Sequence, residues 1–386
     1  MDFQLSEEHR MLQETVRELA ERECRPHAAV WDREARLPDA RVLDQMVEMG
    51  LFGMCLPERY GGGGQEVLAA ILCIEQLARI SPLCAAGVFE SNVGPIRVIE
   101  KFGTEAQRKK FLPLVCQGKM QISVGMTEAE AGSALTDLRT RAEPCQGGFR
   151  IDGRKVFCTG GGHSEAYMVY CRFGDTLGAR GIGAIVVEKG TPGLSFGKQE
   201  QYMGLRGMPG SDLVFDDCVV PAENLVVAAG GFRSLMECFD IERCGNATMA
   251  LGIATGALEV ARDYALERET FGKVIAERQA IQMMIADMAT RVDAARLLVY
   301  RAAVNAGKGF PSVKETSMAK VFANETAKAV TDMAMEVLGG YGYSTEYPVE
   351  RMLRDSRGWP LAGGTLQMQK IIIASTVLGQ RFDQRK

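Results

Sequence analysis

The chain contains 386 residues, 46% of them hydrophobic and 24% charged, with a formal net charge of -4. This length exceeds what one compact core can serve, so we expect two or three domains. The slightly acidic balance, without any Lys/Arg-rich run, argues against nucleic acid or an anionic membrane surface as a partner.

The first 120 residues carry helical signals. Ser6 is a suitable N-cap for a helix over 7–23, in which Leu12, Val16 and Leu19 share one face. A glycine-rich loop at 60–64 precedes a largely buried helix over 66–80, and Thr104 can cap another helix over 105–118. The pattern predicts an N-terminal helical domain over 1–120.

The sequence pattern changes from helical to β-rich between residues 121 and 230. Short β-rich runs at 149–162, 166–173, 182–190 and 211–221 are separated by glycine-containing turns. Strand-length runs at this close spacing predict a middle domain that is a small antiparallel barrel or sandwich.

Long helices resume after residue 230. Apolar residues keep one helical face for five turns at Ile281, Ile285, Met288, Val292, Ala295 and Val299. Such a stripe is typical of bundle packing, so residues 231–386 are predicted to form a helical bundle.

Several classes of site are disfavoured. The eleven cysteines form no CxxC pair and the three histidines lie far apart, which predicts reduced, mostly buried thiols and no metal centre. The chain has no GxSxG elbow and no phosphate-binding GxxxxGK[ST] loop, and the glycines at 178–183 make only a broken GxGxxG. The acidic first ten residues and the absence of a long apolar run lead us to expect a soluble, cytoplasmic protein.

Four longer segments carry a family resemblance, in order along the chain. They are MTEAEAGSA (126–134), RKVFCTGGG (154–162), ERETFGKVIAERQAIQ (267–282) and EVLGGYGYSTEYPVERMLRD (336–355). In these segments the chain resembles the acyl-CoA dehydrogenase family over essentially its whole length. The resemblance implies an α+β multidomain fold with an N-terminal helical domain, a middle β-barrel and a C-terminal four-helix bundle. It also implies a homotetramer, and FAD bound noncovalently between barrel and bundle.

The same resemblance assigns cofactor-binding residues by position. Residues of the same subunit are implied to line the FAD at Met126, Thr127, Gly132, Ser133, Phe157, Thr159, Thr365 and Gln367. Residues implied to reach the FAD of a neighbouring subunit are Arg268, Phe271, Gln279, Gly339 and Gly340. An arginine can neutralise a diphosphate with bidentate geometry, and glycines allow the backbone a close approach, so these residue types suit the assignment.

The catalytic base is the open question. Members of the family commonly carry a glutamate nine residues after the arginine at position 354, but here that position is Gly363. A glycine cannot take a proton, although its backbone N–H can still polarise a thioester carbonyl. A minority of the family supplies the carboxylate from the first bundle helix, which makes Glu242 the predicted base, with Ser133, Asp240 and Arg243 on the CoA side. Glu90 is a lower-ranked alternative.

The resemblance implies an acyl-CoA dehydrogenase that makes a 2-enoyl-CoA and passes electrons to an electron-transferring flavoprotein. Two alternatives on the same fold are an enoyl-CoA reductase and a desulfinase that eliminates sulfite from a sulfinylated acyl-CoA. The segment 81–92 contains no cation to hold a sulfinate, which weakens the desulfinase. A third alternative is a flavoprotein without catalysis, supported only by Gly363.

Overall fold

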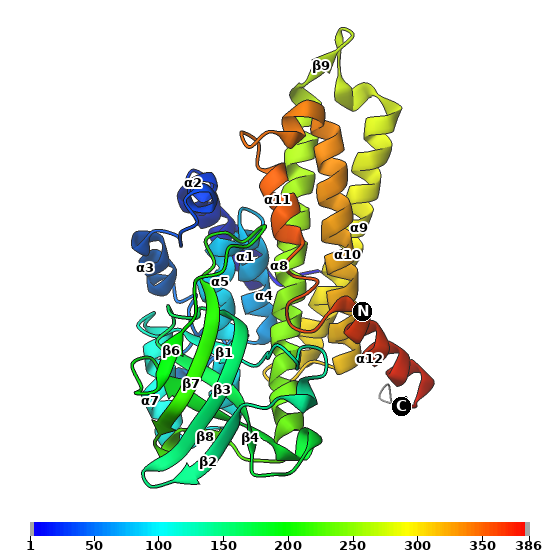
Figure 1. The fold of residues 1–386 in the computed structure, drawn as a ribbon. Helices are drawn as coiled ribbons and strands as arrows, with labels where there is room; N and C mark the ends of the chain where they lie inside the picture. The colour runs from blue at the N-terminus through cyan, green and yellow to red at the C-terminus, as the bar shows by residue number, and fades with distance from the viewer. Residues whose placement is uncertain (1–3, 383–386) are drawn as a thin grey trace.

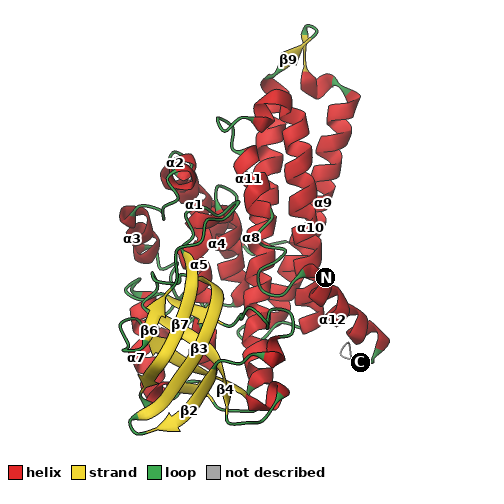
Figure 2. Ribbon diagram, in the orientation of Figure 1, coloured by secondary structure: helices red, strands yellow, loops and turns green. Residues whose placement is uncertain are grey.

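The computed structural model describes residues 4–382, which form three successive parts (Figure 1). Helices come first, strands follow, and long helices close the chain, so the predicted order is confirmed. Figure 2 shows that the strands of residues 122–227 gather in one region, with helices of both other parts beside it, while β9 (Glu269–Thr270) lies apart at the end of the long helices.

The N-terminal part is built from seven α-helices among the described residues. They are α1 (Glu7–Leu19), α2 (Ala28–Arg33), α3 (Ala40–Glu48), α4 (Val67–Ala78), α5 (Pro82–Asn92), α6 (Ile96–Phe102) and α7 (Glu105–Cys116). The Ser6 hydroxyl accepts a hydrogen bond from the His9 N–H, and Thr104 forms a capping box with Gln107, so both predicted caps are confirmed. Every residue of α4 is buried, because it lies between α1, α5 and the bundle.

The middle part is one eight-stranded sheet. Its strands are β1 (Ile122–Gly125), β2 (Arg141–Cys145), β3 (Gly148–Thr159), β4 (Ala166–Phe173), β5 (Ile182–Glu188), β6 (Leu194–Phe196), β7 (Gly210–Val220) and β8 (Leu225–Val227). The order is β6-β7-β3-β2-β4-β5-β8, with β1 paired to β4. The expectation of an antiparallel barrel or sandwich is wrong for two strand pairs, because β4 runs parallel to both β1 and β2; the other pairs of this sheet are antiparallel. β1 follows α7 in the chain, so it enters the sheet from the N-terminal helices rather than through a hairpin.

The C-terminal part consists of three long helices with shorter ones packed on them. The long helices are α8 (Phe232–Glu267), α9 (Gln279–Ala306) and α10 (Val313–Leu338). The shorter α11 (Val349–Ser356) and α12 (Leu366–Leu378) pack against α10, and the small hairpin of β9 (Glu269–Thr270) and β10 (Lys273–Val274) joins α8 to α9. The stripe predicted on α9 is confirmed, since Met288, Val292, Ala295 and Val299 are buried.

The packing explains the cysteines. All eleven are free thiols, and all except Cys145 are buried, as the sequence predicts. Within residues 4–382 no helix is both long enough and apolar enough to cross a membrane.

Candidate active site

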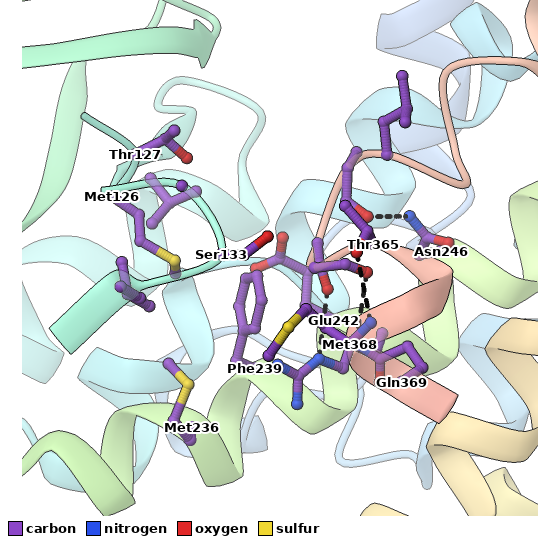
Figure 3. A pocket seen from close by; sticks show the side chains of 18 of the residues that line it. Met126, Thr127, Ser133, Met236, Phe239, Glu242, Asn246, Thr365, Met368 and Gln369 are labelled. Carbon is purple, nitrogen blue, oxygen red and sulfur yellow. Dashed lines mark hydrogen bonds between the residues drawn. The ribbon is translucent and has the colours of Figure 1, made fainter. Parts of the chain in front are cut away.

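One cavity of about 2060 Å³ lies where the middle part, α8 and the segment around α12 meet. A drug-sized ligand usually occupies about 300–1,000 Å³, so this cavity has room for more than one small group. Figure 3 shows its two sides: Met126, Thr127 and Ser133 of the middle part face Phe239 and Glu242 of α8 and Thr365 and Met368 of the C-terminal segment.

The loop after β1 forms the wall on the side of the middle part. Met126, Thr127, Gly132 and Ser133, which the resemblance assigns to FAD, all line the cavity. Among the described residues, the backbone N–H groups of Gly132 and Ser133 have no hydrogen-bond acceptor. Free amides in an exposed loop are suitable donors to an anion such as a diphosphate.

A buried ion pair holds this loop in place. Glu128 accepts hydrogen bonds from the Thr140 N–H at 2.9 Å and from the Lys155 ammonium at 2.8 Å, and the ammonium also donates to the Met126 carbonyl at 3.2 Å. Burial opposes ionisation of Glu128, but the Lys155 charge and the hydrogen bonds that the carboxylate accepts together outweigh it and lower the pKa of this carboxyl. The loop is therefore fixed from behind, which leaves its outer face for a ligand.

An aromatic side chain near the end of β3 is exposed to the cavity. Phe157 lines the cavity with 65% of its surface exposed, and its φ of +54° is unusual for a residue with a side chain. Thr159 lines the same wall. An exposed aromatic ring held in a strained backbone conformation fits a planar ligand, because burying the ring against that ligand recovers apolar contact.

Glu242 enters the cavity from α8. Its carboxylate makes no hydrogen bond or ion pair with any described residue, although the side chain is largely enclosed. Burial raises the pKa of Glu242 to about 7, and the positive charges of Lys320 and Arg243 limit the rise. A carboxyl group with this pKa is poised to take or give a proton at neutral pH.

Glu90 reaches the same cavity from α5. It too lacks a hydrogen-bond partner among the described residues, and burial together with the charge of Glu242 raises its pKa well above the ordinary range. The structure thus brings together two carboxyl groups that are 152 positions apart in the chain. The electrostatic coupling disfavours two negative charges here, so the pKa of Glu90 is raised further by an ionised Glu242.

Asp240 and Arg243 form an ion pair at one edge of the cavity. The Arg243 Nη1 atom donates to Asp240 at 2.6 Å, and the guanidinium lies 5.0 Å from the centre of the Phe239 ring. Burial raises the pKa of Asp240 despite this pairing. Both residues line the cavity, and each is engaged by the other.

Gly363 also lines the cavity, in the segment between α11 and α12. Its φ of +67° lies in the left-handed region, which favours glycine. Its backbone N–H has no acceptor among the described residues, whereas its carbonyl accepts from Arg243 Nε at 3.3 Å. Gly363 therefore presents a free donor within the same cavity as the two carboxyl groups.

The remaining predicted residues lie elsewhere. Thr365 lines the cavity, but Gln367 is exposed and is not among the lining residues. The five residues expected to reach a neighbouring cofactor also do not line this cavity: Arg268, Phe271, Gln279, Gly339 and Gly340. They lie towards the β9 hairpin, at the far end of the bundle (Figure 1). There Arg268 stacks over the Tyr341 ring at 5.8 Å, and Phe271 is 97% exposed.

The polar side chains that bind the backbone carbonyls around Gly363 were not predicted from the sequence. Asn246 donates to the carbonyls of Trp359 and Ala362 at 3.2 and 3.3 Å, and Lys320 donates to the carbonyls of Ala362 and Gly364. The available signal was a lysine at a position of α10 where neighbouring turns carry buried small residues, which marks a buried cation.

Comparisons with known proteins agree with this arrangement. Models of the acyl-CoA dehydrogenase N-terminal, middle and C-terminal domains match residues 6–119, 123–218 and 229–378. An acyl-CoA dehydrogenase of Bacillus subtilis is 40% identical over 97% of this chain and 99% of its own. The solved butyryl-CoA dehydrogenase of Megasphaera elsdenii is 35% identical, covers 98% of this chain and 100% of its own, and superposes with a TM-score of 0.94.

Other relatives with similar sequence identity are named for different reactions. A 3-sulfinopropanoyl-CoA desulfinase of Paraburkholderia xenovorans is 39% identical over 100% of this chain and 99% of its own. An acryloyl-CoA reductase (NADH) of Anaerotignum propionicum is 38% identical over 98% of this chain and 96% of its own. The three domain matches and the shared fold nevertheless point one way: the chain belongs to the acyl-CoA dehydrogenase family, whose members are FAD-dependent oxidoreductases acting on CH–CH bonds.

Proposed function

We propose that this protein oxidises an acyl-CoA thioester to a 2-enoyl-CoA, with Glu242 removing the α proton. One observation carries the proposal: the Glu242 carboxylate faces the cavity without a partner, and its pKa is raised to about 7. A base of this pKa is ionised in about half of the molecules at neutral pH and still binds the abstracted proton well. FAD, when bound, supplies the acceptor for the hydride that leaves the β carbon.

Gly363 has the second role in the proposal. As the α proton moves to Glu242, negative charge develops on the thioester oxygen, and the free Gly363 N–H donates to that oxygen. The reaction can therefore proceed without a glutamate at position 363, because the Gly363 N–H is still the donor and Glu242 on α8 is the base. Ser133, Asp240 and Arg243 are proposed to contact the CoA part at the cavity wall.

The cofactor residues of the proposal form two groups. Those proposed to hold FAD within one subunit line the cavity: Met126, Thr127, Gly132, Ser133, Phe157, Thr159 and Thr365. Those at the hairpin end of the bundle are proposed to reach the FAD of a neighbour in a homotetramer, which is supported by their distance from the cavity of their own chain and by the exposure of Phe271. Gln367 has no support from its position.

An electron-transferring flavoprotein is the proposed electron acceptor. The support is a relative named as the CarC subunit of a caffeyl-CoA reductase-Etf complex of Acetobacterium woodii, which is 37% identical over 97% of this chain.

The reverse reaction, enoyl-CoA reduction, is the second candidate. A Glu242 pKa near 7 favours neither direction, because the protonated form can return a proton to the α carbon as readily as the ionised form removes one. Desulfination has less support, since the segment 81–92 offers no cation to an anionic sulfinate and an ionised Glu242 in the cavity would repel it.

Anaerobic titration tests the proposal. The FAD-loaded protein is mixed with a panel of saturated acyl-CoA thioesters that varies in chain length, branching and polar substituents, while flavin absorbance is recorded. We expect at least one of them to bleach the flavin. Bleaching by none, together with reoxidation of the dithionite-reduced protein by an enoyl-CoA, would favour the reductase instead.

A further inference from the structure

Three successive carbonyl groups in the segment that contains Gly363 are held by side chains. The Lys320 ammonium donates to the carbonyls of Ala362 and of Gly364, the latter at 2.7 Å, and Arg243 donates to the Gly363 carbonyl between them. Asn246 adds a second hydrogen bond to Ala362, drawn in Figure 3. The oxygens of this tripeptide are thus all fixed from α8 and α10.

Fixing a carbonyl also fixes the next N–H group. A trans peptide is planar, and its C=O and N–H bonds point in opposite directions. The described chain has no cis peptide bond, so the Ala362 carbonyl and the Gly363 N–H point opposite ways. Lys320, which holds this carbonyl, is fully buried and does not line the cavity, whereas Gly363 does. The bond from Lys320 therefore turns the Gly363 N–H towards the cavity.

The cation does more than orient this peptide. A positive donor on the carbonyl oxygen withdraws electron density through the amide, which makes the N–H of the same peptide a stronger donor. Lys320 has no carboxylate within 4.0 Å among the described residues, so the carbonyl groups of the loop are its direct partners. A buried ammonium without a paired anion is costly to a fold, which argues that it is kept for a purpose.

We propose that Lys320 is a positioning residue for the reaction: through the Ala362 carbonyl it orients and polarises the Gly363 N–H, and so stabilises negative charge on the thioester oxygen. This inference rests on the proposed function and deepens it. The proton still goes to Glu242, and Lys320 itself touches neither substrate nor cofactor.

Lys320→Met tests the inference, because it keeps the length of the side chain and removes the cation. The matched control is Lys328→Met, the same change two turns along α10, where the lysine is partly exposed and does not line the cavity. The probe is acetoacetyl-CoA, an acidic thioester whose bound enolate gives a long-wavelength charge-transfer band with oxidised flavin. The band reports stabilisation of the thioester oxygen without turnover.

Burial lowers the pKa of Lys320 to about 7, so the measurement is made at pH 6, where most molecules carry the ammonium. There we expect wild type and Lys328→Met to give the band, and Lys320→Met to give about tenfold less of it at saturation, with a similar dissociation constant. One well-placed donor of this kind is worth about 100- to 1,000-fold, and a misdirected one retains part of that. If Lys320→Met does not retain FAD, Lys320→Gln replaces it, since an uncharged donor should give an intermediate band.

Several results would overturn the inference. They are an undiminished band in Lys320→Met or Lys320→Gln, an equal loss in Lys328→Met, and a wild type without any band. The acyl-CoA panel separates this failure from that of the proposed function: a wild type that no saturated thioester bleaches, but whose acetoacetyl-CoA band depends on Lys320, would retain the positioning role and lose the proposed direction of reaction.

Discussion

Asp240 and Arg243 pair with each other at 2.6 Å, and Glu242, which lies between them in the sequence, is left without a partner. Residues three apart on a helix are neighbours on its surface, whereas adjacent residues point in different directions. The pairing therefore satisfies the guanidinium within its own helix. Glu242 points away from this pair and keeps an unpaired carboxylate in the cavity, on which the first two predictions rest.

Glu242→Gln should slow flavin reduction by the active thioester by about 100- to 10,000-fold, the usual worth of a general base. The substitution keeps the shape of the side chain, so FAD content should not change. Exchange of the α proton with solvent deuterium, followed by mass spectrometry, isolates the proton step from hydride transfer. The comparison variant is Glu90→Gln, which should mainly alter substrate affinity; loss of exchange in that variant alone would transfer the role to Glu90.

The pH dependence should follow the Glu242 pKa. The base acts when ionised, so reduction by a saturated thioester should accelerate as the pH rises towards about 7. Burial lowers the pKa of Lys320 to about 7 as well, so loss of its charge should stop the rise above this pH. Stopped-flow measurements from pH 5.5 to 9 would give the profile, to be compared with Glu242→Gln, whose residual rate should lack this limb. A wild-type rate that is flat across this range would exclude Glu242 as the base.

The free energy of unfolding should fall over the pH range in which the reaction rate rises. A carboxyl whose pKa is raised to about 7 in the folded protein loses its proton more easily when unfolded, so it destabilises the fold as the pH rises from 4.5 to 7. Glu242→Gln removes the ionisable group and with it this pH-dependent destabilisation. It should therefore stabilise the protein by on the order of 1–3 kcal/mol at pH 8. Denaturant unfolding at pH 8 and pH 5 would show it: the gain should shrink at the lower pH, and an equal gain at both would point to another cause.

Restoring a carboxylate at position 363 should not rescue Glu242→Gln. Sequence alone favours such a rescue, but Gly363 has a φ of +67°, and a Cβ there would lie 3.1 Å from the Lys320 ammonium. Gly363→Ala should already cost about 1–2 kcal/mol of stability, the usual penalty of this backbone region. Gly363→Glu in the Glu242→Gln background is then compared with Gly363→Ala in the same background. Clearly faster reduction in the glutamate variant would show that the segment can adapt.

Arg268→Ala tests the shared cofactor site. We expect the variant to lose FAD more readily than wild type, although Arg268 lies far from the cavity of its own chain. Gel filtration followed by the flavin-to-protein absorbance ratio measures retention, and sedimentation velocity measures assembly. A monomeric wild type with tightly bound FAD would contradict the shared site. Arg262→Ala, an exposed site nearer the middle of α8, is the control.

Local signals predicted much of the fold. The caps at Ser6 and Thr104 and the stripe on α9 depend on neighbours within a few turns, and the structure confirms them. The parallel neighbours of β4 were not predicted, because strand runs and turns carry no information about pairing between strands that are not joined by a hairpin.

The site was predictable only in part. Glu242, Glu90 and Gly363 come together from three distant segments, and only the family resemblance related them in advance. Lys320 and Asn246 were missed because their partners are backbone carbonyls, which residue types do not reveal; the small residues around Lys320 on α10 indicate its burial but not its partners. Polar contacts to the main chain, unlike charge pairs, become visible only once the loop is folded.

The length of α8 has a consequence for cofactor occupancy. From Glu242 to Arg268 the helix rises about 40 Å, so no single FAD can be near both residues of one polypeptide. If the hairpin end serves a cofactor, that cofactor sits on another chain, and its binding is coupled by mass action to assembly. Dilution below the assembly constant would then release flavin even at constant free FAD, and protein concentration would set the fraction of holoenzyme.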